Sequence, residues 1–165
     1  MIVKYTVENR EHVSAKSYEE VVAVFEAAVG DAEHGEVTEA LRTVDNAGDW
    51  EQAMVALFGP AGFVRVFSLD HGRWQGLYGT KAKAKKYVYG NPIVAETMLR
   101  HDLRAGLQVP LSIMIREDDD GHARVSYDLP SSAMGFIDNP DLAEAAMALD
   151  ARLTAFVREL TGAAA

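Results

Sequence analysis

The 165-residue sequence contains no cysteine. This absence excludes disulfide bonds, thiol nucleophiles, iron–sulfur clusters and zinc sites with cysteine ligands. It fits a reducing compartment, so we expect a cytoplasmic protein. No apolar run reaches the roughly 18 residues that a membrane-spanning helix needs, and no signal-peptide pattern opens the sequence. The sequence therefore predicts a soluble domain with no membrane partner.

Basic residues are scarce relative to acidic ones. Lysine and arginine number 16 against 25 aspartates and glutamates, and the formal net charge is −9. Such a charge repels duplex nucleic acid, so we expect no nucleic-acid partner. The strongest basic cluster consists of Lys81, Lys83, Lys85 and Lys86. We interpret it as lysines that protect an edge strand from pairing with another sheet, in preference to a phosphate contact.

The remaining composition is that of one globular domain spanning residues 1–165, with 48% hydrophobic and 25% charged residues and no linker that would divide it. Periodicity and β-branched residues predict strands over 1–7 (resuming near 12–14), 63–70, 83–89, 110–117 and 122–128. Helices are predicted over 18–29, 37–44, 50–58 and 92–102, and from 140 onward. Residues 71–80, with three glycines, are predicted to form a loop, and the trailing residues 163–165 are expected to fray.

Local signals mark the ends of several of these elements. Ser17 and Glu20 form a capping box at the start of the first helix, and Asp49 is predicted to cap the helix that follows it. The turn at 118–121 combines aspartates with Gly121 and predicts a β-hairpin. Because this tight turn joins antiparallel strands and no regular βαβ alternation appears, the fold class is predicted to be α+β.

Several segments together carry a resemblance to a known family. They are 89–98, 100–102, 106–107, 110–111, 117–121 and 126–132. The chain resembles the bacterial and archaeal domain-of-unknown-function family numbered 302, best over about residues 63–160. The resemblance implies an antiparallel curved sheet with helices packed on one face, in the order β-α-β(4)-α, similar to the TATA-box-binding-protein fold. Residues 31–62 then form a variable helical insert. The family has no established activity, so the resemblance supplies no catalytic residue.

Metal and cofactor sites find little support. Among the five histidines, no two have the spacing of a local metal pair, so we expect no metal and no cofactor. A site assembled from Asp70, His71 and His101 is less favoured than separate surface roles for these side chains. The acidic turn is not a calcium loop, because Arg116 and Tyr127 would occupy its first and last ligand positions.

The candidate ligand-binding residues are Asn91, Arg100, His101, Tyr127, Asp128 and His71. The Asn91-Pro92 turn opens a predicted helix whose backbone N–H groups suit an anion or carboxylate. Ile93, Thr97 and His101 share one face of that helix, which predicts an apolar neighbour for His101.

We interpret the chain as a small-ligand-binding or interaction domain, and we expect a homo-oligomer, specifically a dimer. A pocket is predicted between the sheet and its helices, from the apolar and aromatic residues of the central strands. Its catalytic residues, if it has any, are unknown. One alternative is an enzyme that uses acid–base chemistry, with His101 or His71 acting beside Asp70 or Asp128. The other is a structural or regulatory partner protein with an exposed apolar patch.

Overall fold

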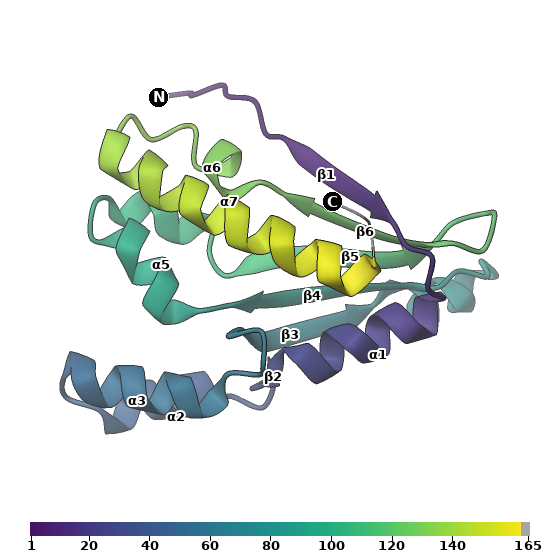
Figure 1. The fold of residues 1–165 in the computed structure, drawn as a ribbon, viewed down its shortest axis with the longest axis horizontal. Coiled ribbons are helices and arrows are strands. Elements are labelled where there is room, and N and C mark those ends of the chain that lie inside the picture. The colour runs from purple at the N-terminus through teal and green to yellow at the C-terminus, as the bar shows by residue number, and fades with distance from the viewer. Residues whose placement is uncertain (163–165) are drawn as a thin grey trace.

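A six-stranded sheet forms the centre of the protein, whose computed structural model describes residues 1–162 (Figure 1). The expected fraying of 163–165 lies outside this range. The strand order is β1-β6-β5-β4-β3-β2, and every neighbouring pair is antiparallel except the parallel pair β2 and β3. The strands are β1 Asn9–Val13, β2 Gly30–Asp31, β3 Val64–Asp70, β4 Ala84–Gly90, β5 Leu111–Glu117 and β6 Ala123–Asp128.

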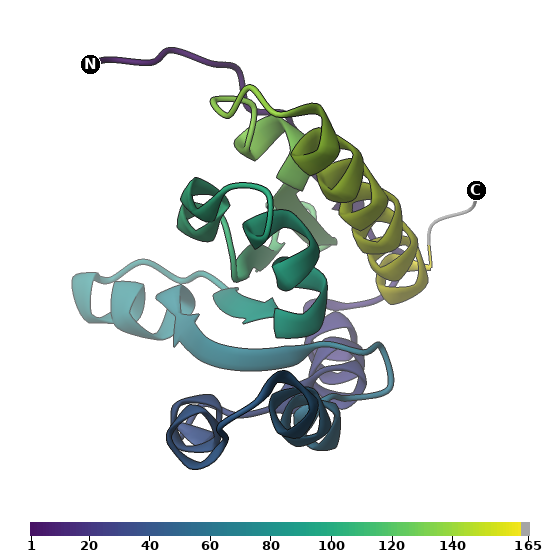
Figure 2. The same ribbon diagram turned by 90° about the vertical axis from the view of Figure 1, so that its left-hand side faces the viewer.

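Helices cover one face of this sheet, which confirms the predicted α+β class (Figures 1 and 2). In both views α5 lies between the helices α2 and α3 on one side and the long helix α7 on the other. Within residues 1–162, no helix combines the length and apolar character needed to cross a membrane. The α-helices are α1 Tyr18–Ala28, α2 Glu36–Thr43, α3 Ala47–Leu57, α4 His71–Gln75, α5 Pro92–Leu99, α6 Pro130–Ala133 and α7 Pro140–Thr161, and the 3-10 helices are η1 Gly76–Tyr78 and η2 Leu103–Leu107.

The first helix begins where its capping box predicts. The Ser17 hydroxyl accepts a hydrogen bond from the Glu20 N–H at 3.2 Å, and the Glu20 carboxylate accepts one from the Ser17 N–H at 2.8 Å. These two bonds satisfy donors that a helix start otherwise leaves open. One turn further on, Val21 and Phe25 are spaced four residues apart and are both fully buried. The cap thus fixes the start of α1, and the four-residue spacing directs its apolar face onto the sheet.

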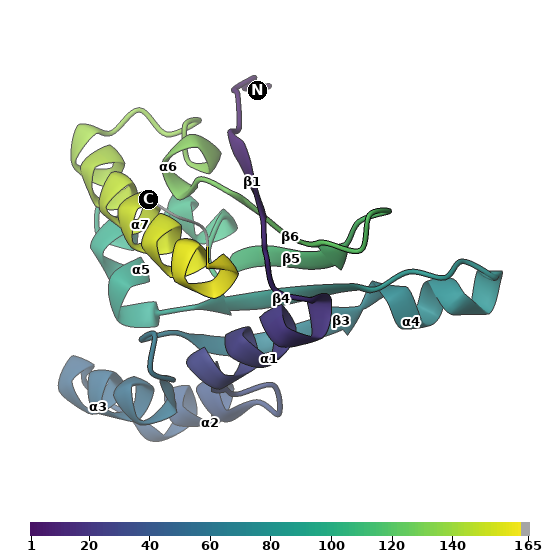
Figure 3. The same cartoon turned by 45° about the vertical axis from the view of Figure 1, so that its right-hand side comes forward.

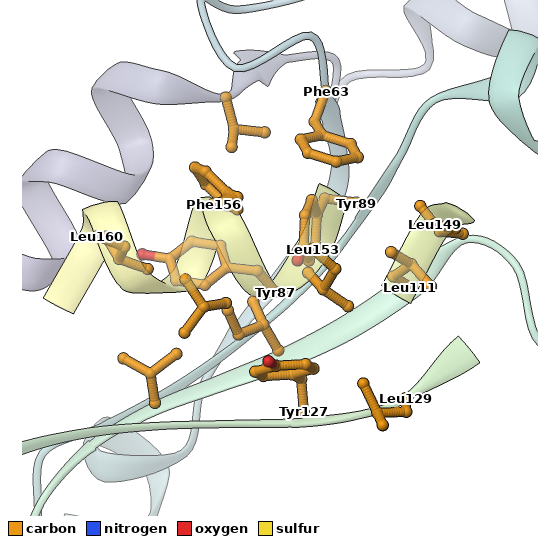
Figure 4. Close-up of a cluster of buried hydrophobic side chains, with 14 of the residues drawn as sticks. Phe63, Tyr87, Tyr89, Leu111, Tyr127, Leu129, Leu149, Leu153, Phe156 and Leu160 are labelled. Carbon is orange, nitrogen blue, oxygen red and sulfur yellow. The ribbon is translucent and has the colours of Figure 1, made fainter. Parts of the chain in front are cut away.

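Aromatic rings fill the core between the sheet and α7 (Figure 4). Tyr87, Tyr89 and Tyr127 project from β4 and β6 toward the helices. The Phe25 ring centroid lies 4.5 Å from that of Tyr87 and 5.3 Å from that of Tyr89. Phe156 of α7 approaches the same group. Rings at these separations pack favourably and dominate the apolar area that the core buries.

Three predicted strand and loop assignments are wrong. Residues 1–7 form no strand, because β6 ends at Asp128 opposite Asn9 and offers no partner to the residues before it. Residues 71–80 form α4 and η1 rather than a loop. Strand β4 lies between β3 and β5, so the lysines at 83, 85 and 86 do not guard a sheet edge. In each case the observed structure depends on pairing between segments that are distant in the chain, and local composition does not specify that pairing.

Two predicted helix boundaries also differ from those in the structure. The predicted helix 50–58 begins earlier, at Ala47, because the Asn46 side chain accepts from the Asp49 N–H at 3.0 Å and is the cap. The helix predicted over 92–102 ends at Leu99. His101 therefore lies beyond the end of α5 and is exposed, so it does not share a face of this helix with Ile93 and Thr97 as predicted. The two-residue strand β2 and the short helix α6 were not predicted.

Candidate functional site

An apolar pocket lies at the end of the sheet where β3 begins and β4 ends. Its cavity volume is about 440 Å³, within the range of small-molecule sites. The walls come from the start of α2, the first residues of β3, the first turns of α5 and the segment that enters β5. They include Val37, Thr38, Val64, Val66, Pro92, Val94, Ala95, Met98, Val109, Pro110 and Leu111. This site lies at the end of the sheet, whereas the sequence predicted one between the sheet and its helices.

Two local features of the chain shape this pocket. Strand β4 ends at Gly90, and Asn91 and Pro92 start α5 directly, which turns the chain away from the sheet. On β3, the pairing register with β4 shifts between Arg65 and Phe67. Such a bulge bends the strand and changes the direction of the side chains beside it. The pocket therefore forms where a strand bends and its neighbour ends.

Two polar side chains at the pocket wall, Asn91 and Glu33, are already engaged in hydrogen bonds. The Asn91 amide oxygen accepts from the N–H groups of Ile93 and Val94 at 2.9 and 3.0 Å, and the amide nitrogen donates to the Gly62 carbonyl at 2.9 Å. The Glu33 carboxylate accepts from Arg65 at 3.1 Å and from Ser68 at 3.0 Å. Since these groups are satisfied, the pocket offers mainly apolar contact to a ligand.

A more polar groove adjoins the pocket between α5 and α7. Val94 and Leu149 line both cavities, so the two are adjacent at these side chains. The ionisable side chains of the groove are Arg100, His101, Asp141, Glu144 and Arg152. Together the two cavities could hold a molecule with an apolar body and a polar end.

Arg152 of α7 lies where the groove meets the core. Its guanidinium donates to the carbonyls of Ala61 and Gly62 at 3.4 and 3.3 Å and lies 4.9 Å from the Phe63 ring centroid. Arg100 is paired with Glu96, as expected for residues four apart on a helix. Arg152 could not be selected from the sequence, because its partners lie about ninety residues away in the chain.

The six candidate ligand-binding residues do not form one cluster. Asn91 lines the apolar pocket, and Arg100 and His101 line the groove. Tyr127 is buried in the core, where its hydroxyl lies 3.4 Å from both His12 Nε2 and Thr154 Oγ1. A ligand-binding role for the three residues at the two cavities stays a prediction.

The other two candidates lie elsewhere. Asp128 is exposed on β6, where its carboxylate accepts from the Asn9 amide at 2.8 Å. His71 is in α4, where its Nδ1 accepts from the Trp74 indole at 3.1 Å. Figure 3 shows α4 and α5 at opposite ends of the sheet. His71 and His101 therefore do not share a site, and an acid–base role for either histidine beside Asp70 or Asp128 stays a prediction.

One group of potential metal ligands occurs in the described part of the chain, in the β5–β6 turn. Single ligand atoms of Asp118, Asp120 and His122 lie within 4.8 Å of one another. The Asp118 carboxylate, however, accepts from the N–H groups of Asp120 and His122 and from the Arg124 guanidinium. Hydrogen bonding to Arg124 lowers the pKa of this carboxyl. These bonds are those of a well-formed turn, so we assign the group no metal-binding role.

The lysines of β4 and its approach form ion pairs. Lys83 binds the carboxylates of Glu19 and Glu117 at 2.8 Å each, and Lys85 binds Glu26 at 2.7 Å. The Tyr87 hydroxyl donates to the same Glu26 oxygen at 2.6 Å. Burial alone would raise the pKa of Glu26, but the hydrogen bonds from Lys85 and Tyr87 outweigh it and lower that pKa. The positive charge of these two lysines is therefore largely offset within the protein.

Fold and cavity together define a class: an α+β domain whose sheet is covered by helices on one face and has an apolar pocket at one end. A family model described as "Domain of unknown function DUF302" matches residues 39–160. Since this match spans most of the chain, the protein belongs to the DUF302 family, which confirms the resemblance read from the sequence.

A solved structure supports the same assignment at the level of the fold. The crystal structure of an uncharacterized conserved DUF302 protein from Bacillus stearothermophilus is similar, with a TM-score of 0.61. The alignment covers 89% of this chain and 93% of that one, at 15% sequence identity. No match was found among curated protein sequences. The family has no assigned function, and the likeness to the TATA-box-binding-protein fold stays a prediction.

Proposed function

We propose that this protein binds a small molecule with an apolar body and a polar end. The observation that carries the proposal is the apolar cavity of about 440 Å³ at the end of the sheet. A soluble domain commonly closes such a space with its own side chains, because empty apolar volume costs packing energy. The side chains of Asn91 and Glu33 already have hydrogen-bond partners within the protein, so the pocket suits the apolar body of a ligand. The adjoining groove with Arg100, His101 and Arg152 would receive the polar end of the ligand.

The wider biological setting is part of the same proposal. A cytoplasmic location is supported by the absence of cysteine, and a homodimer is the assembly that we expect. The acidic net charge of −9 opposes a nucleic-acid partner, so the ligand class is small molecules.

Substitution of Ala95 tests the pocket directly. Ala95 is in α5 and lines the cavity, so Ala95→Phe should fill part of it and exclude a ligand. Ala143→Phe is the matched control, because Ala143 is exposed on α7 and lines neither cavity. The probe is N-phenylnaphthylamine, an apolar dye that fluoresces when shielded from water.

We expect saturable binding of one dye molecule per chain in the wild type and in Ala143→Phe. In Ala95→Phe the affinity should fall by at least about tenfold, because the added ring competes for the same volume. Dye binding that is equal in the two variants, or absent in the wild type, would contradict the proposal. If the dye binds as expected, native mass spectrometry of the protein purified gently from its own cells would identify the natural ligand class from any retained mass.

A further inference from the structure

The connection between β3 and β4 forms an arm that projects beyond the sheet (Figure 3). We define the arm as residues 70–82, which contain α4 and η1. Leu77 is 85% exposed and Tyr78 is 80% exposed, and Trp74 is also exposed. Phe67 and Leu69, on the strand that leads to the arm, are exposed as well. So many large apolar side chains within twelve residues mark an interaction surface.

The arm has a defined structure. The Asp70 carboxylate accepts from the Arg73 N–H at 2.8 Å, and the rings of Trp74 and Tyr78 meet edge to face with centroids 6.2 Å apart. At its base, Gly72 approaches the Ala82 carbonyl so closely that a β-carbon would lie 2.3 Å from that oxygen. A preformed surface loses little conformational entropy on binding, which favours association.

The outer edge of β3 is open beside the arm. Strand β2 pairs with Val64 and Arg65 only, so in the described chain residues 67–70 have no strand partner on that side. An open edge with exposed apolar side chains readily pairs with another strand. Toward the other edge of the same sheet face, Glu11 binds Arg116 and Arg124. Exposed apolar side chains thus gather at the β3 edge and on the arm.

Charge favours a second copy of this chain as the partner. Arg73, Lys81 and Lys86 take part in none of the ion pairs found within residues 1–162. The segment 31–38, which begins in β2, contains three acidic residues and no lysine or arginine. Arg65 pairs with Asp31 and Glu33, so the segment and Arg65 together keep a net charge of −2. An anionic lipid surface would attract the arm but repel the rest of a chain whose net charge is −9.

We propose that two copies pair through the open edges of β3 in antiparallel orientation, so that the arm of each copy lies against segment 31–38 of the other. In this arrangement the interface is the same on both copies and closes as a twofold dimer. The strand rise of about 3.4 Å places the partner's Asp70 within about 10 Å of Val64 and Val66. The eight residues of α4 and η1 add about 12 Å of reach at helical rise.

The partner's arm would then reach the rim of the apolar pocket. Gly35, Val37 and Thr38 of segment 31–38 line that pocket. The dimer does not require a ligand, and only the role of the arm as a cover for the pocket rests on the proposed function. Loss of dye binding in Ala95→Phe tests the ligand, whereas the mass in solution tests the dimer, so the two can fail separately.

The mass in solution gives the first test, by light scattering during gel filtration. The wild type should elute as a species of twice the 18.0 kDa chain mass. Leu77→Asp should raise the dissociation constant of the dimer by at least about tenfold, because it places a charge in the apolar contact. Leu103→Asp is the matched control and should stay dimeric, since Leu103 is 81% exposed on η2, away from the arm. Thermal unfolding should show that both variants fold.

Cross-linking tests the contact itself, and the absence of native cysteine makes the result unambiguous. When Leu77→Cys and Val37→Cys proteins are mixed and oxidised, a disulfide-linked pair of one chain of each kind should form. A mixture of Leu103→Cys and Val37→Cys should not cross-link. A monomeric wild type, a Leu77→Asp variant as dimeric as the wild type, or failure of the 77–37 cross-link would overturn the proposal. So would a monomer that sediments with phosphatidylglycerol vesicles, which would assign the arm to membranes.

Discussion

Two buried tyrosines on the same strand have opposite hydrogen-bonding situations. The Tyr87 hydroxyl donates to Glu26 at 2.6 Å, whereas the Tyr89 hydroxyl is fully buried and has no partner in the described structure. Burial raises the pKa of both phenols, and the bond to Glu26 raises that of Tyr87 further. Both side chains therefore stay neutral, and the difference between them is the missing hydrogen bond of Tyr89.

Substitution of each tyrosine by phenylalanine should therefore change stability in opposite directions. We expect Tyr89→Phe to raise the free energy of unfolding by about 1 kcal/mol, because it removes an unpaired buried hydroxyl. Tyr87→Phe should lower it by about 1–2 kcal/mol, since the carboxylate of Glu26 loses a donor. Urea unfolding curves measure both values. Destabilisation of the same size in both variants would mean that the Tyr89 hydroxyl has a partner, such as a buried water.

At the level of elements, the segment that contains α2 and α3 is held against the sheet by a close backbone contact between Gly30 and Gly59. A β-carbon on Gly30 would lie 1.8 Å from the Leu57 carbonyl oxygen, and one on Gly59 would lie 2.5 Å from the Ala28 carbonyl oxygen. Backbone contacts this close leave no room for a side chain. The end of α3 is thereby held against β2, and α2 is held beside the pocket.

Gly30→Ala should therefore lower the free energy of unfolding by about 2 kcal/mol or more, because the backbone at the end of α3 must move away. Gly76→Ala is the control, since a β-carbon there meets no atom within 4 Å and its φ of −57° suits alanine. That variant should stay within about 0.5 kcal/mol of the wild type. Thermal and denaturant unfolding provide the comparison. Equal stability of Gly30→Ala and the wild type would show that α3 is only loosely attached to β2.

Elements encoded by local chemistry were predictable from sequence, and those defined by distant partners were not. The capping box at Ser17, the Asp118–Gly121 hairpin turn and the apolar stripe of α7 each reside in one short segment, and each is confirmed. The interior position of β4 and the pairing of β2 depend on segments far away in the chain. Glycines at 72, 76 and 79 suggested a loop, but Gly72 packs closely against Ala82 and two of these glycines are within α4 and η1.

The candidate site was only partly predictable for the same reason. Asn91 was identified because its capping role is visible in the sequence Asn-Pro, and Arg100 and His101 follow on the same segment. The pocket itself brings together segments near residues 35, 65, 95 and 110. No periodicity connects them, since their meeting depends on the order of the strands. Tyr127 was selected as a pocket residue, but it contributes to the core instead.

For the molecule as a whole, the charge distribution predicts no affinity for duplex DNA. The net charge is −9, and Lys83 and Lys85 are paired with carboxylates. Labelled duplex DNA should show no rise in fluorescence anisotropy with this protein at physiological salt, because too few cations are free to displace counterions. Binding that persists at about 200 mM salt would contradict this prediction and identify a basic surface on the arm as the binding site.

The pairing of β1 with β6 also determines when the sheet can be completed. Asn9 lies opposite Asp128 in that pair, so β1 has no strand partner until a segment much later in the chain has been synthesised. Meanwhile the apolar face of α1, with Val21 and Phe25, has neither β4 nor α7 to cover it. Folds built on such distant contacts form slowly, and their incomplete chains expose apolar surface that is prone to aggregation. We therefore expect the nascent chain to need protection on the ribosome, and the sheet to form only after β6 and α7 have been synthesised.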